Sequence, residues 1–379
     1  MKVLILNQHA NNFGDEAAGT AVVSNLLKNK NVEKIELLYC MPKSLPIEDK
    51  RVIHNHDIDV RTLTKKEFII FMLFRKKTGK FLPMFIDKLR EYDTILISPC
   101  GANLGIYQDW GLLLQDIVTV QQKKTPIFHL NTISKSGSCF FDLLVRYVCK
   151  KSIVYVREKS SFDYLKSKGI EVKLGTDSVF ALETKDIIKQ RNDKIVFVPS
   201  DVWDWHVDFK EEERETFYHY VLNPVLEFAS KYNMTISILP HVNTEREKIF
   251  NDGILDYANR NFSNVNIMIE QAKEFYDYEN CIRTATFVIG MRYHAIVFAA
   301  KNAIPYVALA YEQKMREVSS YSGQIENCID LKSLDSECLL RDKLESVLKN
   351  LESIREQLYN KCEDIKNKSL IVIKENFDE

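Results

Sequence analysis

Short apolar runs alternate with amphipathic stretches along most of the chain. The runs are rich in Val, Ile and Leu, and a helical spacing of apolar positions follows several of them. Apolar runs of this length indicate buried strands, and strands that alternate with helices are typical of a parallel sheet. The predicted strands are residues 3–7, 94–98, 127–130, 153–156, 195–199, 235–240, 265–269, 287–289 and 306–309.

A charged segment, residues 183–194, interrupts this alternation near the middle of the chain. We therefore predict an α/β protein with two Rossmann-like domains, residues 1–190 and 191–341. Residues 342–379 are highly charged, with Leu and Ile at helical spacing, which predicts a closing helical segment. No internal repeat stands out.

The charge balance bears on the kind of ligand. Lys and Arg number 52 against 53 Asp and Glu, so no overall charge favours nucleic acid. An anion preference must come from local placement, and a small anion is the expected partner.

Cysteine spacing and the N-terminal sequence bear on location. The eight cysteines form no CxxC pair, and the first residues, MKVLILNQ, lack the apolar core of a secretory signal. We expect a cytoplasmic protein. His54 and His56 lie in a polar HNHD loop without metal-ligand spacing, so no metal site is predicted.

No apolar run reaches the length needed to cross a bilayer. Residues 65–80 nevertheless place a block of Phe, Ile, Met and Leu between clusters of Lys and Arg. Such a stretch predicts peripheral contact with the anionic inner face of a membrane, although a helix buried in the N-terminal domain has the same pattern.

The most informative stretch is residues 283–314, because it places Arg292 and His294 directly after a predicted strand. Gly290 permits a tight turn, and residues 295–300 read as a short helix. Side chains suited to anions and proton transfer are thus expected at a strand's carboxyl end, beside a helix N-terminus.

Four segments together resemble the polysaccharide pyruvyl transferases. They are NNFGDEA from Asn11, VREKSSFDYLKSKGI from Val156, GTDSVF from Gly175 and GMRYHAIVFAAKNAIPYVAL from Gly290. The resemblance implies a GT-B-like fold, with the two domains facing a cleft and the N-terminal domain on the acceptor side. It also implies transfer of pyruvate from phosphoenolpyruvate onto two sugar hydroxyls to form a cyclic ketal, without a cofactor.

One loop departs from the family pattern. Where the family usually has a run of glycines, this chain has SPCGANLG, which retains only Gly101 and Gly105. Asn103 is expected to supply hydrogen bonds to the acceptor instead.

The implied donor carries a phosphate and a carboxylate, which favours arginine forks. Arg292 and Arg157 are the predicted donor-binding residues because both follow apolar runs, and Lys314 is expected to add a charge against phosphate. An ion pair with Glu158 or a capping role is the alternative for Arg157.

Ketal formation needs an acid to protonate the methylene carbon and a base for the attacking hydroxyl. We predict His294 as the acid or as a phosphate ligand, and Asp15 as the second catalytic residue. A helix N-cap is the alternative for Asp15.

Further polar and aromatic residues follow predicted strands in the C-terminal domain. His241, Glu312, Trp203 and Trp205 are predicted to bind the acceptor sugar, with the indoles stacking on it. A small local core is the alternative for the two tryptophans.

The leading hypothesis is a ketal-forming enzyme of bacterial surface polysaccharide biosynthesis, acting on a free or lipid-linked sugar. Two alternatives stay open: a GT-B glycosyltransferase that uses a nucleotide sugar, and a non-catalytic carbohydrate-binding relative.

Overall fold

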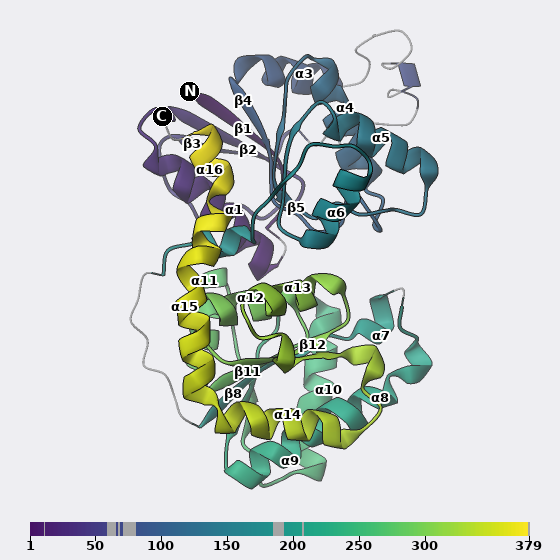
Figure 1. The fold of residues 1–379 in the computed structure, drawn as a ribbon, viewed down its shortest axis with the longest axis vertical. Helices are drawn as coiled ribbons and strands as arrows, with labels where there is room; N and C mark the ends of the chain where they lie inside the picture. Colours follow the sequence, from purple (N-terminus) through teal and green to yellow (C-terminus); the bar gives the residue numbers. More distant parts are fainter. Residues whose placement is uncertain are drawn as a thin grey trace. The chain divides into compact units, whose positions relative to one another are not determined.

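The chain forms two compact units in a computed structural model that describes residues 1–10, 12–58, 66, 69–70, 81–184, 193–206 and 208–377. Unit 1 comprises Met1–Asn11, Asp15–Glu183 and Lys366–Glu379. Unit 2 comprises Asn12–Gly14 and Thr184–Ile365. Figure 1 shows one sheet with flanking helices in each unit.

Unit 1 is built on a parallel sheet with the strand order β3-β2-β1-β4-β5-β6-β7. Apolar residues alternate between its two faces, as the period of two along a strand requires. Leu6, Ile97 and Phe128 pair across neighbouring strands and share one core cluster. The strands are β1 (Lys2–Gln8), β2 (Lys34–Tyr39), β3 (Val52–Asn55), β4 (Thr94–Ile97), β5 (Ile127–Asn131), β6 (Ile153–Val156) and β7 (Lys173–Leu174).

Helices cover both faces of this sheet. The cluster on one face includes residues of α3 (Phe81–Glu91), α4 (Trp110–Gln121), α5 (Cys139–Cys149) and α6 (Lys159–Ser167). The cluster on the other face includes residues of α1 (Phe13–Lys28) and α16 (Ile371–Asn376). Parallel strands covered on both faces explain the nearly continuous apolar runs in the sequence.

Unit 2 repeats this topology with the order β10-β9-β8-β11-β12-β13, again all parallel. The chain order reverses between β8 and β11, which makes their carboxyl ends the topological switch point of the sheet. The strands are β8 (Lys194–Val198), β9 (Thr235–Ile238), β10 (Ile267–Ile269), β11 (Phe287–Gly290), β12 (Tyr306–Ala310) and β13 (Cys328–Asp330).

Most helices of unit 2 connect consecutive strands of its sheet. The α-helices are α7 (Val202–Trp205), α8 (Glu215–Phe217), α9 (Asn223–Tyr232), α10 (Glu245–Asn261), α11 (Phe275–Arg283), α12 (Tyr293–Lys301), α13 (Gln313–Tyr321), α14 (Glu337–Lys349) and α15 (Leu351–Ser369). The last of them, α15, begins in unit 2 and ends in unit 1.

The predicted α/β class is confirmed, and the nine predicted strands all overlap strands of the structure. The prediction omitted β2, β3, β7 and β13, of which β7 and β13 are very short. The expected boundary near residue 190 lies outside the described residues, and the units divide between Glu183 and Thr184.

The predicted membrane-contacting stretch, residues 65–80, also lies outside the described residues, except for Lys66, Ile69 and Ile70. Within the part of the chain that the structure describes, no helix is both long enough and apolar enough to span a membrane.

The C-terminal helix α16 completes the core of unit 1. Val372 and Ile373 are buried in the same cluster as Val22 and Leu26 of α1. The Tyr155 hydroxyl donates a hydrogen bond of 2.6 Å to Glu375, which fixes the helix over the sheet. The end of the chain thus belongs to the unit in which the chain begins.

We expect Ile373→Ala to lower the free energy of unfolding of unit 1 by about 2–5 kcal/mol, because it leaves a cavity beneath α16. Urea unfolding measures this loss. Lys374→Ala is the matched control, since Lys374 is exposed on the same helix and should change stability by only about 0.5 kcal/mol. Equal effects would show that α16 is not part of the core.

Candidate active site

Polar side chains follow four neighbouring strands of unit 2. Trp205 and His206 lie beyond β8, His241 beyond β9, Arg292 and His294 beyond β11, and Glu312 and Lys314 beyond β12. Because β9, β8, β11 and β12 are adjacent and parallel, their carboxyl ends share one edge of the sheet. Ligands of open α/β sheets bind at this edge, next to the switch point.

The turn after β11 is short because the strand and helix α12 pack closely. Arg292 has extended backbone angles at the N-cap, and α12 is buried along almost its whole length. A side chain on Gly290 would press against Ile296, at 3.2 Å, so glycine keeps the helix close to the strand. The buried helix therefore fixes the positions of Arg292 and His294.

Arg292 is held on two sides. Its Nη2 lies 3.2 Å from Oε2 of Glu247, and its guanidinium carbon lies 5.5 Å from the ring centroid of Trp205. Among the described residues, its buried Nε has no hydrogen-bond partner. A positioned guanidinium with an unused donor is suited to an anionic ligand.

Glu247, on the first turn of α10, is a site residue that the sequence reasoning missed. Its Oε1 accepts the backbone N–H of His241 at 2.7 Å, while its Oε2 pairs with Arg292. Burial raises the pKa of the Glu247 carboxyl, and the charge of Arg292 opposes this shift. The signal was available, because Thr244 caps α10 and a Glu three residues later is typical of a helix start.

Two histidines lie side by side in the site. The rings of His241 and His294 are nearly parallel, with centroids 6.0 Å apart, and Nδ1 of His241 lies 3.2 Å from the hydroxyl of Tyr278. Burial lowers the pKa of His241 well below its ordinary value, and the charges of Arg292 and Lys314 lower it further. His241 is therefore a neutral imidazole at physiological pH.

Glu312 organises the opposite end of the cluster. Its carboxylate lies 2.6 Å from Nζ of Lys314 and 3.5 Å from Nε2 of His206. Burial alone would raise the pKa of Glu312, but the hydrogen bond from His206 and the charge of Lys314 outweigh it and lower the pKa to about 2. The carboxylate thus stays ionised and holds Lys314 near the ring of Tyr293, 5.6 Å away.

The segment 12–14 packs with unit 2 at this cluster. Asn12 forms a bridge with Val242, and the ring of Phe13 stacks on Tyr278 with centroids 5.1 Å apart. A side chain on Gly14 would overlap the imidazole of His294. Only glycine therefore fits at position 14 while His294 keeps its present position.

The two tryptophans have different surroundings. Trp203 is 5% exposed and packs edge-on against Phe209 and Phe217, so the structure favours a local core for it over stacking on a sugar. Trp205 lies against Arg292 and Tyr311. Its acceptor-binding role stays a prediction, as do those of His241 and Glu312.

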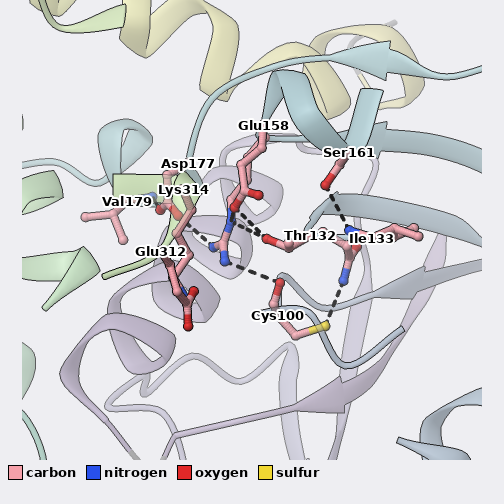
Figure 2. A network of polar contacts seen from close by, with 11 residues as sticks. Cys100, Thr132, Ile133, Glu158, Ser161, Asp177, Val179, Glu312 and Lys314 are labelled. Carbon is pink, nitrogen blue, oxygen red and sulfur yellow. Dashed lines mark hydrogen bonds and ion pairs between the residues drawn. The ribbon is translucent and has the colours of Figure 1, made fainter. Parts of the chain in front are cut away.

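Arg157, in unit 1, is enclosed by polar partners. Its Nη1 lies 2.7 Å from Asp177, its Nε 3.3 Å from Thr132, and its Nη2 3.4 Å from the carbonyl of Cys100. Figure 2 shows Thr132, Glu158 and Asp177 close together in this network. The side chain is 4% exposed, and it also pairs with Glu158 at 3.5 Å. The ion pair with Glu158 that the sequence offered as an alternative is present, and the donor-binding role of Arg157 stays a prediction.

Asp177 links this network to the next turn of the chain. Its Oδ1 accepts the backbone N–H of Val179 at 2.9 Å and caps a short 3-10 helix. Thr132 in turn donates to Glu158 at 2.7 Å. The buried charges are thus mutually satisfied, as buried ions must be.

The other predicted residues of unit 1 lie on its loops and first helix. Asp15 lies in the first turn of α1, partly exposed, and Asn103 lies in the turn after β4. The backbone N–H of Asp109 donates to the carbonyl of Asn103 at 2.9 Å, which closes that turn. The roles predicted for both side chains stay predictions.

Among the described residues, no group of three or more His, Cys, Asp or Glu side chains is placed to hold a metal ion.

Two parallel-sheet units with this strand order define a GT-B-like fold, and solved structures agree. A UDP-GlcNAc 2-epimerase from Neisseria meningitidis, bound to UDP-GlcNAc, has 12% identity and a TM-score of 0.64, with 99% of each chain covered. The epimerase of Methanocaldococcus jannaschii has 14% identity and a TM-score of 0.60, covering 91% of this chain and 92% of its own. HepE of Anabaena, in complex with UDP-glucose, has 12% identity and a TM-score of 0.59, covering 99% and 97%.

Within this fold class, the sequence identifies the family. The model of the polysaccharide pyruvyl transferase family matches residues 12–313, and the chain belongs to that family. The curated proteins contain no significant match to the chain.

We expect Gly14→Ala to lower the free energy of unfolding of unit 2 by about 1–3 kcal/mol, since the added methyl group must displace His294. Gly253→Ala is the control: Gly253 lies within α10, its nearest neighbour is the Tyr218 hydroxyl at 3.9 Å, and alanine should stabilise the helix by about 0.5–1 kcal/mol. Denaturant unfolding of both variants tests this. An undiminished stability of Gly14→Ala would contradict the contact.

Lowering the pH from 7 to 5 is expected to destabilise unit 2 through His241. The unfolded imidazole takes up a proton near pH 6.5, about its ordinary pKa, whereas the folded pKa is well below this value. The unfolded state thus binds more protons below pH 6.5, and stability falls by up to about 1.4 kcal/mol per pH unit.

His241→Gln cannot titrate, so its unfolding free energy should depend less on pH than that of the wild type. Burial also lowers the pKa of His129, in unit 1, to about 4. His129 therefore lowers stability at acidic pH equally in the wild type and in His241→Gln. The difference between the two urea-unfolding profiles isolates His241. Superimposable pH profiles would refute the assignment.

Proposed function

We propose that this protein transfers pyruvate from phosphoenolpyruvate onto two hydroxyls of a sugar, forming a pyruvate ketal in polysaccharide biosynthesis. The observation that carries the proposal is the arrangement of Arg292, His294, His241 and Lys314 at one edge of the unit 2 sheet, in a chain of the pyruvyl transferase family. Phosphoenolpyruvate is the donor substrate, and no cofactor takes part.

Arg292 and Lys314 bind the donor's phosphate and carboxylate. Glu247 engages only one terminal nitrogen of Arg292, which leaves a further edge of the guanidinium for a ligand. The two carboxylates Glu247 and Glu312 hold the cations in place before the ligand arrives. Preorganised charge of this kind binds anions without reorganisation during the reaction.

His294 acts as the proton donor. It delivers a proton to the methylene carbon of the enol phosphate, and the adjacent carbon becomes an oxocarbenium ion that a sugar hydroxyl attacks. A second hydroxyl then displaces phosphate at the same carbon, so the products are the ketal and inorganic phosphate. His241 lies beside His294 and is kept neutral by burial, so it can hydrogen-bond to the acceptor without carrying a charge.

Asp15 is proposed as the base for the attacking hydroxyl, and Asn103, Trp205 and His241 as acceptor contacts. The acceptor is a sugar of a surface polysaccharide, free or attached to a lipid carrier. We also propose that the protein works in the bacterial cytoplasm, with residues 65–80 touching the inner face of the membrane.

A second candidate is a glycosyltransferase that uses a nucleotide sugar. It is favoured by one observation, that structures of the same fold were solved with UDP-GlcNAc and UDP-glucose. In a glycosyltransferase, Arg292 and His294 would bind the pyrophosphate of the nucleotide sugar at the N-terminus of α12.

Ligand-induced thermal stabilisation separates the two candidates, because a ligand that binds only the native state raises the unfolding temperature. Phosphoenolpyruvate should stabilise the purified protein, whereas UDP, GDP and CMP should not. A shift with a nucleotide and none with phosphoenolpyruvate would favour the glycosyltransferase.

We expect Arg292→Ala to abolish the shift with phosphoenolpyruvate, and His294→Ala to keep most of it. His294→Ala should instead lower acceptor-dependent phosphate release by roughly 100- to 10,000-fold, the usual contribution of a positioned acid. Arg260→Ala and His219→Ala, at exposed positions of unit 2, are the matched controls. Full activity of both site variants would remove the assignment.

A further inference from the structure

Helix α5 of unit 1 is apolar on two opposite faces. Phe141, Val145 and Val148 are at most 3% exposed and form part of the core. On the outer face, Phe140 is 63% exposed and Leu143 59%. Large apolar side chains gathered on an exposed surface often mark a site of contact with a protein or a membrane, so the outer face of α5 calls for a partner.

The exposed surface extends beyond α5. Tyr147 continues the outer face one turn further on, and the ring of Trp110, 40% exposed, lies 6.1 Å from that of Phe140. Ile106 and Tyr107, each 49% exposed, lie in the loop before α4, which Gln108 ties to the carbonyl of Ser136 at 3.1 Å. We call these six residues the α5 patch: Ile106, Tyr107, Trp110, Phe140, Leu143 and Tyr147.

The region that contains α5 and α6 is strongly basic. Residues 135–168 carry seven exposed cations against two aspartates, Asp142 and Asp163, when the buried pair Arg157 and Glu158 is set aside. The seven cations are Lys135, Arg146, Lys150, Lys151, Lys159, Lys166 and Lys168.

Several of these lysines lie over aromatic rings. Nζ of Lys151 is 5.4 Å from the ring centroid of Tyr147, and Nζ of Lys168 is 5.6 Å from that of Tyr164. Phe162 has Lys159 and Lys166 at 5.9 and 5.5 Å. Apolar, aromatic and cationic side chains are thus interleaved along the outer surfaces of α5 and α6.

We propose that the α5 patch docks on the surface of an anionic lipid bilayer. Aromatic and aliphatic side chains enter the boundary between headgroups and acyl chains, while flanking lysines meet the lipid phosphates. The long lysine stems suit this arrangement, because they follow the apolar surface and keep the ammonium in the headgroup layer.

The charge pattern favours lipid over a protein partner. A protein-binding patch of this size ordinarily carries few lysines, whereas a basic rim around apolar side chains complements an anionic membrane. The proposal does not depend on the donor substrate, and it rests on residues other than 65–80.

Co-sedimentation with vesicles tests the α5 patch. The purified full chain should bind vesicles of equal parts phosphatidylglycerol and phosphatidylcholine, and bind phosphatidylcholine vesicles much less. The variant Phe140→Ser with Leu143→Ser should lower the bound fraction by roughly tenfold. Ile249→Ser is the matched control, because Ile249 is 65% exposed on α10 of unit 2.

A charge variant tests the basic rim. Lys150→Glu with Lys151→Glu should remove the preference for phosphatidylglycerol, whereas Lys30→Glu with Lys50→Glu, which alters two other exposed lysines of unit 1, should keep it. Raising the salt concentration should weaken binding of the wild type, since the attraction is screened.

Three results of the vesicle assay would overturn the proposal: no binding of the wild type to anionic vesicles, equal binding by Phe140→Ser with Leu143→Ser, or loss of binding only in Lys76→Glu with Lys77→Glu, which would move the contact to residues 65–80. A dimer in solution that Phe140→Ser with Leu143→Ser dissociates would also overturn it, in favour of a second copy. Thermal stabilisation by phosphoenolpyruvate is measured in parallel, so failure of the proposed donor and failure of membrane docking are distinguishable.

Discussion

The buried carboxylate of Glu247 is the constraint on which the site in unit 2 depends. A carboxylate taken out of water must find charges or hydrogen-bond donors, because an uncompensated buried ion is strongly destabilising. Arg292 and the backbone N–H of His241 supply them, from the ends of two different strands. One side chain on α10 thereby fixes both the guanidinium and the loop that carries the histidine, and Glu312 does the same for Lys314 and His206.

This compensation also sets the electrostatics of the cluster. Two cations and two carboxylates are arranged as separate pairs, and burial together with the charges of Arg292 and Lys314 lowers the pKa of His241. The positions of the pairs follow from the sheet, because β9, β8, β11 and β12 are neighbours with parallel strands. The fold thus brings together residues that are far apart in the sequence.

Local patterns sufficed for nine of the strands and for the place of Arg292 and His294 after one of them. The strands β8, β11 and β12 are buried throughout, so they read as continuous apolar runs, and the residues that follow them must emerge at the carboxyl edge. The family resemblance rested on four short motifs. The family model matches residues 12–313, the part of the chain in which these motifs lie apart from Asn11.

Other features depend on distant pairings that no local pattern encodes. Glu247 and Arg292 are separated by 45 positions. Arg157 contacts Asp177, 20 positions further on, and Thr132, 25 positions before it, and neither contact is visible in a local pattern. The burial of Trp203, in contrast to Trp205, likewise depends on where Phe209 and Phe217 lie.

The path of the chain has a consequence for synthesis on the ribosome. Unit 1 begins with the first strand but receives α16 only after all of unit 2 has been made. Unit 2 can therefore complete its core first, while the sheet of unit 1 exposes the surface that Val372 and Ile373 later cover. The core of unit 1 is therefore complete only when its last helix has been made, so this unit exposes apolar surface for longer during synthesis than unit 2 does.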